Sequence, residues 1–199
     1  MAVELPELVV ADAAAWREWL GEHFADPAGV WLVLAKKGTT VPTCLTYDEA
    51  LDEALCHGWI DGQVQRRDEG TYRQRFTPRR QRSPWSKRNI GIVERLTAEG
   101  RMRPSGLAEV ERARSDGRWQ AAYAGPASID VPDDLAAALA AEPKAKAWFD
   151  VLTAQNRYAV LYRLHDAKRP ETRARRLEQY VGMLARGETP YPQRRRPED

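Results

Sequence analysis

Residues 46–77 constrain the fold most, because a capped helix there leads directly into a β-hairpin pattern. Thr46 and Glu49 have the spacing of a capping box, and Gly58 stands where the helix would end in a left-handed residue. The segments "WIDGQVQRR" and "TYRQRFT" then flank the turn "DEG", which is typical of two antiparallel strands. The sequence therefore predicts a small α+β domain at this point of the chain.

Further segments add helices and one more strand to this domain. Asp12 is expected to cap a helix whose apolar face includes Trp16. The segment "VWLVLAKK" (30–37) is apolar on both faces, which suits a buried strand. Two helices should follow the hairpin, one starting at Ser83 or Ser86 and one over 104–115. We expect an antiparallel sheet of about three strands packed with helices.

The C-terminal part of the chain has a different character. The segment "AGPASIDVP" (124–132) is rich in turn residues and marks the expected boundary. Pro132, Pro143 and Pro170 each stand where the first turn of a helix accepts proline, and Thr153 is a further expected cap. The expected parts are an α+β domain over 1–123, an all-helical subdomain over 132–187 and a disordered tail over 188–199.

Charge is distributed unevenly along the chain. The stretch 70–93 holds seven of the 31 basic residues and none of the 29 acidic ones. The remainder therefore carries 24 basic against 29 acidic residues, a net charge of −5, although the whole chain is at +2. The seven basic residues are Arg73, Arg75, Arg79, Arg80, Arg82, Lys87 and Arg88. Such a local positive field acts on anionic ligands even when the whole chain is nearly neutral.

This basic stretch has two interpretations. Arginine binds carboxylate or phosphate through two parallel N–H donors, and period-two alternation places Arg73 and Arg75 on one strand face. In the first interpretation these arginines converge on an anion. The candidate ligand-binding residues are Trp59, Asp61, Arg73, Arg75, Arg79, Arg80, Trp85 and Lys87. In the second, the arginines pair with the protein's own acids, and Arg79 and Arg80 bind helix C-termini or Asp61.

The "GWIDG" turn offers an acid next to the arginines. Trp59 and Asp61 point the same way on a strand, and Trp59 and Trp85 are expected at the edge of a pocket. Asp61 could act as a general base or orient a substrate. Alternatively, Asp61 accepts hydrogen bonds from Trp85 or an arginine and fixes the hairpin. A single carboxylate without a partner acid, histidine or metal is not a mechanism, so the catalytic residues stay unknown.

Other chemistry finds less support in the sequence. Cys56 and His57 are adjacent on a helix and point about 100° apart, so Cys56 is expected to pack as a small apolar group. The histidines are scattered and no CxxC, HxxxH, GxGxxG or P-loop pattern occurs, so we expect no metal and no cofactor. The basic segment "HDAKRPETRARR" (165–176) is either a solvated helix face or, through Lys168, Arg169 and Arg173, a second wall of the anion site.

Composition narrows the class of protein. Two cysteines, Cys44 and Cys56, do not make a disulfide framework in 199 residues. The first residues lack the basic segment of a signal peptide, and no apolar run approaches the roughly 20 residues of a membrane span. We expect a cytoplasmic protein without membrane insertion. A nucleic-acid partner is the weaker alternative, because such proteins usually have a pI above about 9 and this chain is at about 8.6.

Four motifs together carry a resemblance to a known family. They are "GWIDG", "RFTPRR", "WSKRN" and "AKRPETR". The chain resembles the YdeI/OmpD-associated, or bacteriocin-protection, family from about Trp16 to Gly187. The resemblance implies an α+β core, a helical C-terminal segment and a loose link to stress or bacteriocin tolerance. It implies no established reaction and no catalytic residue.

The combined expectation is a cytoplasmic tolerance factor that binds a small anionic ligand, or an acidic segment of a partner, through an arginine–tryptophan pocket. Two alternatives stay open at this point. One is an enzyme that uses Asp61 as acid or base while arginines hold a phosphate or carboxylate. The other is a nucleic-acid-binding stress protein, whose affinity would fall steeply with salt. The oligomeric state does not follow from the sequence.

Overall fold

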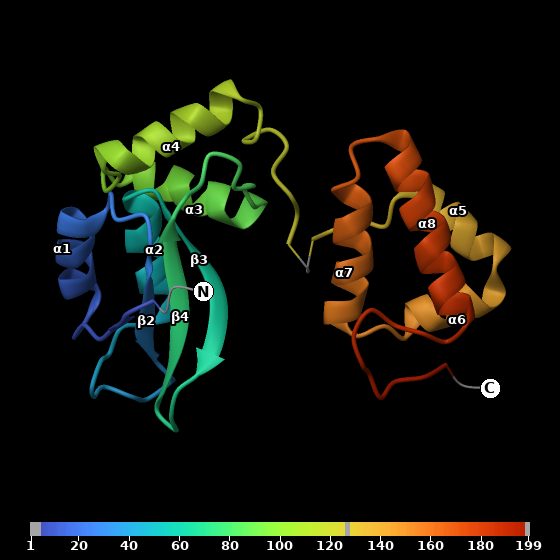
Figure 1. Cartoon of the computed structure of the whole chain (residues 1–199), viewed down its shortest axis with the longest axis horizontal. Coiled ribbons are helices and arrows are strands. Elements are labelled where there is room, and N and C mark those ends of the chain that lie inside the picture. Colours follow the sequence, from blue (N-terminus) through green and yellow to red (C-terminus); the bar gives the residue numbers. More distant parts are fainter. Residues whose placement is uncertain (1–4, 126–127, 198–199) are drawn as a thin grey trace. The chain divides into compact units, whose positions relative to one another are not determined.

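The computed structural model describes residues 5–125 and 128–197. Residues 1–4, 126–127 and 198–199, which belong to the predicted first domain, linker and tail, lie outside the described residues. The chain divides into two compact units, Met1–Ala122 and Tyr123–Asp199, which are called unit 1 and unit 2 below (Figure 1). Unit 1 combines a sheet with helices, and unit 2 is helical. The predicted α+β class with a helical C-terminal part is therefore confirmed.

The element bounds are as follows. Unit 1 contains β1 (Glu7–Leu8), α1 (Ala13–His23), β2 (Val30–Ala35), α2 (Tyr47–Cys56), β3 (Trp59–Arg66), β4 (Thr71–Pro78), α3 (Lys87–Ala98) and α4 (Pro104–Ser115). Unit 2 contains α5 (Asp133–Ala141), α6 (Pro143–Asp150), α7 (Ala154–His165) and α8 (Pro170–Ala185). In the described residues no helix is both long and apolar enough to cross a membrane.

The strand order in the sheet is β1-β2-β4-β3. β4 lies between β2 and β3 and pairs antiparallel with both, so the three predicted antiparallel strands are confirmed. The sheet also has a fourth strand that the sequence did not predict, because β1 pairs parallel with β2 over two residues. A strand of two residues shows no alternation pattern, so its pairing is visible only in the folded chain.

Local capping signals in the sequence are confirmed. Asp12 accepts from the backbone of Ala15 at 2.9 Å, and Thr46 forms the predicted capping box at the start of α2. Ser86 and Thr153 cap α3 and α7. Pro143 and Pro170 occupy first helical turns as predicted, whereas Pro132 is the residue that precedes α5. Gly58 has φ +81°, the left-handed conformation that ends α2 before β3 begins.

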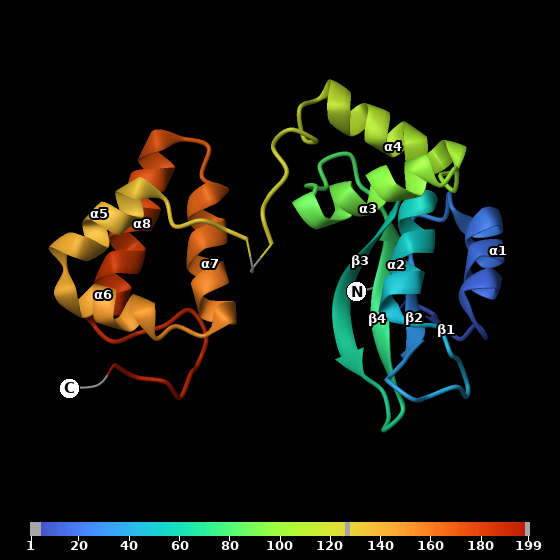
Figure 2. The ribbon, with the colours of Figure 1, turned by 180° about the vertical axis from the view of Figure 1, so that it is seen from behind.

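One face of the sheet carries the hydrophobic core of unit 1. Helices α1 and α2 cover this face, and α2 lies against the strands in both views (Figures 1 and 2). Trp16 of α1 contacts Trp59 and Phe76 of the hairpin, with ring centroids at 6.2 and 5.8 Å. The opposite face carries no helix within the described residues of unit 1 (Figure 1). Arg73 and Arg75 alternate with the buried Gln74 and Phe76, as predicted.

A buried carboxylate ties three segments of unit 1 together. Glu53 of α2 is almost fully buried and accepts from Arg17 Nε and Nη2 of α1 at 2.8 and 2.7 Å. Arg101, which lies between α3 and α4, donates to the same carboxylate at 2.6 Å. Ion pairs with this geometry satisfy the oxygens that burial removes from water. The Glu53 clamp, formed by these three residues, therefore fixes α1 and the α3–α4 connection to α2.

Unit 2 has its own core and its own ion pair. Arg173 of α8 makes two parallel hydrogen bonds to Asp134 of α5, at 2.6 and 2.7 Å, and a third to the Leu164 carbonyl of α7. Residues of the predicted disordered tail also contact this unit. The side-chain amide of Asn156 in α7 donates to the Gln193 side chain and to the Tyr191 carbonyl. The tail is therefore held against α7 as far as Gln193.

Two helical glycines lead to a stability prediction. A Cβ added at Gly106 of α4 would lie closer than 3.0 Å to the Cys56 carbonyl of α2, whereas a Cβ at Gly91 of α3 would meet nothing within 4 Å. We expect Gly106→Ala to lower the free energy of unfolding by about 1–3 kcal/mol, since a backbone group must shift. Gly91→Ala should raise it by about 0.5–1 kcal/mol through helix propensity. Urea denaturation of both variants tests this, and equal effects would contradict the close helix contact.

The Glu53 clamp leads to a pH prediction. Burial would raise the pKa of Glu53, but hydrogen bonds from Arg17 and Arg101 outweigh burial and hold the pKa below its ordinary value of 4.5. A lowered folded-state pKa stabilises the protein fully above the unfolded value and loses its effect as the pH falls through the folded value. The stability difference between the wild type and Glu53→Gln should therefore be largest near neutral pH and narrow below about pH 4.5. Denaturant titrations across this range, with the exposed Glu111→Gln as control, measure it.

Candidate anion-binding site

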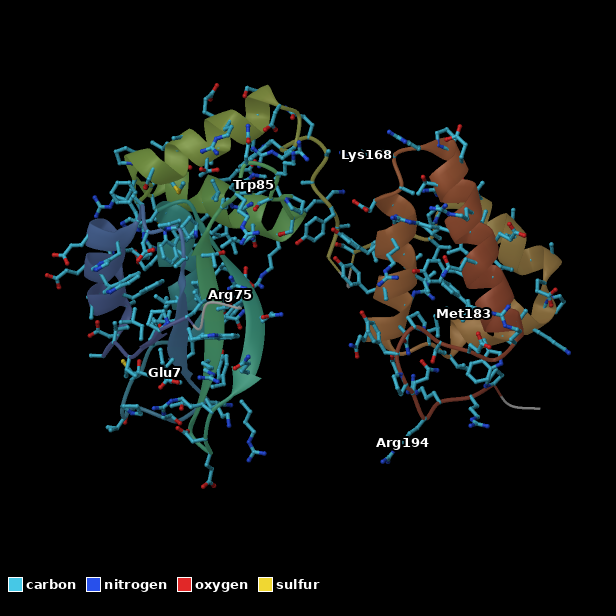
Figure 3. All side chains as sticks on the ribbon, in the orientation of Figure 1. Glu7, Arg75, Trp85, Lys168, Met183 and Arg194 are labelled. Atoms are coloured by element: carbon cyan, nitrogen blue, oxygen red, sulfur yellow. The ribbon has the colours of Figure 1, made fainter. Side chains whose placement is uncertain are left out.

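The basic stretch separates into three environments in the structure. Arg73 and Arg75 lie on β4, and Arg79 lies buried after it. The remaining members, Arg80, Arg82, Lys87 and Arg88, are exposed in the following loop and at the start of α3. Figure 3 shows Arg75 along β4 and Trp85 at the end of unit 1 where α3 and α4 lie. The predicted residues therefore do not line a single pocket but contribute to a scaffold and to a surface.

The surface lies on the helix-free face of the sheet. Strand pairing sets Arg75 opposite Trp31 of β2, so their side chains share this face. The Arg73 guanidinium lies 5.4 Å from the centroid of the Trp31 ring. Arg73 also donates to Gln65 of β3 at 2.9 Å and has a long contact of 3.4 Å to Glu7 of β1. All four strands thus contribute to this face, which is called the open sheet face below.

Arg75 is the member of this face whose charge is not compensated. Its Nε is buried and has no hydrogen-bond partner, and no ion pair of Arg75 occurs within residues 5–125 and 128–197. Its stem packs on Gly62 of β3, where a Cβ would lie 3.7 Å from the arginine Cβ. The absence of a side chain at Gly62 leaves room for this packing. An unsatisfied buried donor costs about 1–3 kcal/mol, and no hydrogen bond of the Arg75 guanidinium within the described residues offsets this cost.

Arg79 and Trp85 form a scaffold beneath the loop. Arg79 is only 5% exposed and Trp85 only 2%. The Arg79 guanidinium lies 3.5 Å from the Trp85 ring centroid and donates to the Pro84 carbonyl at 3.2 Å. Trp85 in turn contacts Trp119, at 5.0 Å between centroids, and Arg114 lies over the Trp119 ring. This stack of cations and aromatic rings holds the loop 80–85 against the segment after α4.

The predicted position of both tryptophans at a pocket edge is wrong. Trp59 is fully buried, donates to the Phe24 carbonyl at 2.9 Å and packs edge to face on Trp16. Trp85 belongs to the same core. Charged neighbours in the sequence suggested exposure, but adjacent strand residues point to opposite faces of the sheet. Large aromatic rings bury 150–250 Å² each and dominate core packing.

Asp61 has a different partner from the predicted ones. Its carboxylate accepts from the Tyr47 hydroxyl of α2 at 2.9 Å, rather than from Trp85 or an arginine. Burial and the neighbouring Asp61 raise the pKa of Tyr47 to about 12, so the phenol keeps its proton. Arg88 donates to the same hydroxyl at 3.3 Å and pairs with Asp48 at 3.0 Å. Asp61 therefore joins the start of the hairpin to α2, the structural role that one interpretation assigned to it.

Internal ion pairs do not neutralise the exposed part of the basic stretch. Among its exposed and half-exposed members in the described chain, only Arg73 and Arg88 pair with acids. Arg75, Arg80, Arg82 and Lys87 have no acidic partner within the described ranges. The interpretation that the protein's own acids compensate the stretch therefore holds for two of these members and not for the other four.

Sequence reasoning missed two contributors, Trp31 and Tyr47. Trp31 lies in a strand that is apolar on both faces, so only its pairing with β4 shows that it shares a face with the arginines.

The second basic segment of the sequence, 165–176, lies in unit 2. Arg173 of this segment forms an ion pair with Asp134, so its charge is compensated and it is not available as a wall of an anion site. No group of three or more His, Cys, Asp or Glu side chains fit for a metal ion occurs in the described parts.

The contrast between Arg79 and its neighbour gives a prediction. We expect Arg79→Ala to lower the free energy of unfolding by about 2 kcal/mol, because it removes a desolvated guanidinium from the Trp85 ring. Arg80→Ala should change it by less than about 0.5 kcal/mol, since Arg80 is exposed. Thermal or urea unfolding of both variants distinguishes them. An Arg79 variant as stable as the Arg80 variant would show that the stack does not support the fold.

Comparison with known families gives two matches. Residues 8–109, just over half of the chain, match the model of a domain of unknown function (DUF8412). Residues 128–187 match the family described as bacteriocin-protection, YdeI or OmpD-associated. The predicted resemblance is thereby confirmed for this segment, rather than for the whole expected span from Trp16 to Gly187. Neither the curated proteins nor the solved structures contain a match to this chain.

Proposed function

Because the chain belongs to the family of the domain of unknown function DUF8412 and carries a YdeI/OmpD-associated segment, we propose its role from the site itself: unit 1 binds an anionic ligand on the open sheet face. The observation that carries the proposal is the uncompensated guanidinium of Arg75. Its Nε is removed from water without an acceptor, which is unfavourable in the unliganded protein. Arg75 as a whole is half-exposed, and its terminal nitrogens make no hydrogen bond within the described residues, so a ligand oxygen that accepts from them would compensate the charge.

The neighbouring residues favour a carboxylate or phosphate group. A guanidinium presents parallel N–H donors that match two oxygens of such a group, and Arg73 supplies a second guanidinium on the same face. Trp31 adds an aromatic surface for the uncharged part of a ligand. Among the described residues, Glu7 is the acid that contacts Arg73 on this face, and its distance of 3.4 Å leaves the pair weak.

The exposed cations of the loop contribute at longer range. Arg80, Arg82 and Lys87 carry no acidic partner in the described part of the chain, so their field extends into solvent. Such a field raises the rate at which anions approach, and salt screens it over about 10 Å at 0.1 M. In this proposal Arg73 and Arg75 bind the ligand directly, and the exposed cations of the loop attract anions from solution.

Arg75→Ala tests this proposal directly. Hydrogen bonds to a charged group contribute about 1.5–3 kcal/mol, so the variant should bind an anion roughly 10- to 150-fold more weakly. Lys37→Ala removes one charge from an exposed turn of the same unit and should leave binding unchanged. Calorimetric titration with citrate, a phosphorylated sugar and an acidic peptide identifies the ligand class.

The same variants decide between the alternatives. Arg75→Ala should change stability little, because removal of an unsatisfied donor offsets the lost packing of the stem on Gly62; a loss of several kcal/mol would assign Arg75 a structural role and contradict the proposal. Binding confined to single-stranded oligonucleotides, with a steep log-linear salt dependence, would favour a nucleic-acid partner instead. Turnover of a bound compound that is lost in Asp61→Asn would favour the enzyme alternative.

Cytoplasmic location and a part in stress or bacteriocin tolerance stay predictions. Fractionation of cells that produce the full chain tests the location. Comparing bacteriocin survival of cells that carry the wild type or Arg75→Ala tests whether tolerance depends on the proposed site.

A further inference from the structure

A pocket of about 520 Å³ lies in unit 1 away from the basic stretch. It is lined by one side of α1 from Ala14 to Phe24, by His57 at the end of α2, and by Arg103, Pro104 and Ser105 at the start of α4. Next to the lining residues Ser105 and His57, Gly106 of α4 meets the Cys56 carbonyl of α2, so the two helices that carry them lie in close contact. No residue of the proposed open sheet face takes part in it, so the two sites are independent.

His57 is a pocket residue with an acceptor that no described residue uses. The residue is 95% buried, and its Nδ1 lies 3.0 Å from the Glu53 carbonyl oxygen. A carbonyl can only accept, so Nδ1 carries the proton and the neutral ring presents Nε2 as a lone pair. Burial is the main cause that lowers the pKa of His57, and the charges of Arg103 and Arg17 act in the same direction. Nε2 has no hydrogen bond within the described residues, and His57 is one of the residues that line the pocket.

Arg103 and the start of α4 give the pocket positive charge. Arg103 is exposed, and its side chain makes no hydrogen bond or ion pair within the described chain. Its backbone is fixed, because its N–H donates to the Cys56 carbonyl at 3.0 Å. No side chain caps α4, and Pro104 has no N–H, so the amide of Ser105 is the first helical donor. A helix N-terminus of this kind carries a partial positive charge.

Helix α1 adds one basic and one acidic side chain, Arg17 and Glu18, to the lining of the pocket. Arg17 uses Nε and Nη2 in the Glu53 clamp, and Nη1 makes no hydrogen bond in the described part of the chain. Of the residues that the structure describes, Glu18 is the acid that lines the pocket. Because Glu53 compensates Arg17, the remaining charges of the lining are Arg103 and the helix N-terminus against Glu18, which leaves a positive excess at the start of α4. Phe24 and Pro104 add apolar surface next to these polar groups.

We propose that this pocket binds a small organic anion that carries a carboxylate or phosphate group together with a hydroxyl or amine hydrogen. The anionic group accepts hydrogen bonds from the guanidinium of Arg103 and from the backbone N–H of Ser105. The hydrogen of the hydroxyl or amine is donated to Nε2 of His57, the unused acceptor. The carbon skeleton packs on Phe24 and Pro104. A 2-hydroxy acid or a phosphate ester of a polyol has this combination of groups.

Lactate and propionate separate the two parts of this recognition, because they differ only in a hydroxyl group. Titration of the ¹⁵N-labelled full chain, followed by the ring nitrogens of His57, should show lactate and glycerol 3-phosphate binding at millimolar concentrations. Lactate should bind about tenfold more tightly than propionate, the effect of one hydrogen bond of ordinary strength. Arg103→Ala should weaken every one of these anions at least tenfold. Arg112→Ala, which removes a charge from the other end of α4, should change none of them.

Two substitutions at His57 test the role of Nε2. Asparagine keeps a donor near the position of Nδ1 and removes the acceptor, so His57→Asn should abolish the preference for lactate while propionate still binds. Glutamine places its amide near Nε2, and His57→Gln should restore part of the preference. In these variants the amide signals of Ser105 and Gly106 report binding in place of the ring.

Three results would overturn the inference. They are the absence of any shift at His57 with lactate or glycerol 3-phosphate, equal affinity for lactate and propionate, and unchanged affinity in Arg103→Ala. Arg75→Ala should leave all of these signals as in the wild type. Failure of the open sheet face as a site is therefore distinguishable from failure of the pocket.

Discussion

The buried carboxylate of Glu53 is the interaction on which unit 1 depends most. It receives three hydrogen bonds from Arg17 and Arg101, and these join α1 and the α3–α4 connection to α2. The backbone carbonyl of the same residue holds Nδ1 of His57. A charge this deep is tolerated only because every oxygen is engaged. The same residue therefore fixes the helix arrangement and sets the tautomer of the histidine that lines the pocket.

The arginines of this protein fall into groups by the partner that the fold gives them. Arg17 and Arg101 neutralise a buried acid, Arg79 stacks on a buried ring, and Arg173 joins helices of unit 2. Arg75 and Arg103 lack acidic partners within the described residues. Their positions differ: Arg75 lies along a sheet face, and Arg103 stands at a helix N-terminus beside an imidazole. The first geometry suits a carboxylate or phosphate laid against strands, and the second suits a small molecule with a donor.

Most of the fold follows from short-range signals. The capping box at Thr46, the cap at Asp12 and the left-handed Gly58 act within four residues along the chain, so the sequence is sufficient to place α1, α2 and the hairpin. The parallel strand β1 escaped prediction because two residues hold no period. The candidate site was predicted by residue type, and alternation along β4 correctly put Arg73 and Arg75 on one face. Burial of Trp59 and Trp85 was not predictable, because it depends on rings remote in the chain, Trp16 for Trp59 and Trp119 for Trp85.

By itself the sequence determined the order of the elements after β1, the α+β class, the family of the C-terminal segment and the concentration of positive charge in 70–93. The tertiary structure decided which of those charges are compensated. Strand register set Trp31 opposite Arg75, and helix packing brought His57, Arg103 and α1 around one pocket. The physical reason is that a hydrogen bond or ion pair depends on distances of about 3 Å between side chains, and only the folded chain brings remote residues this close.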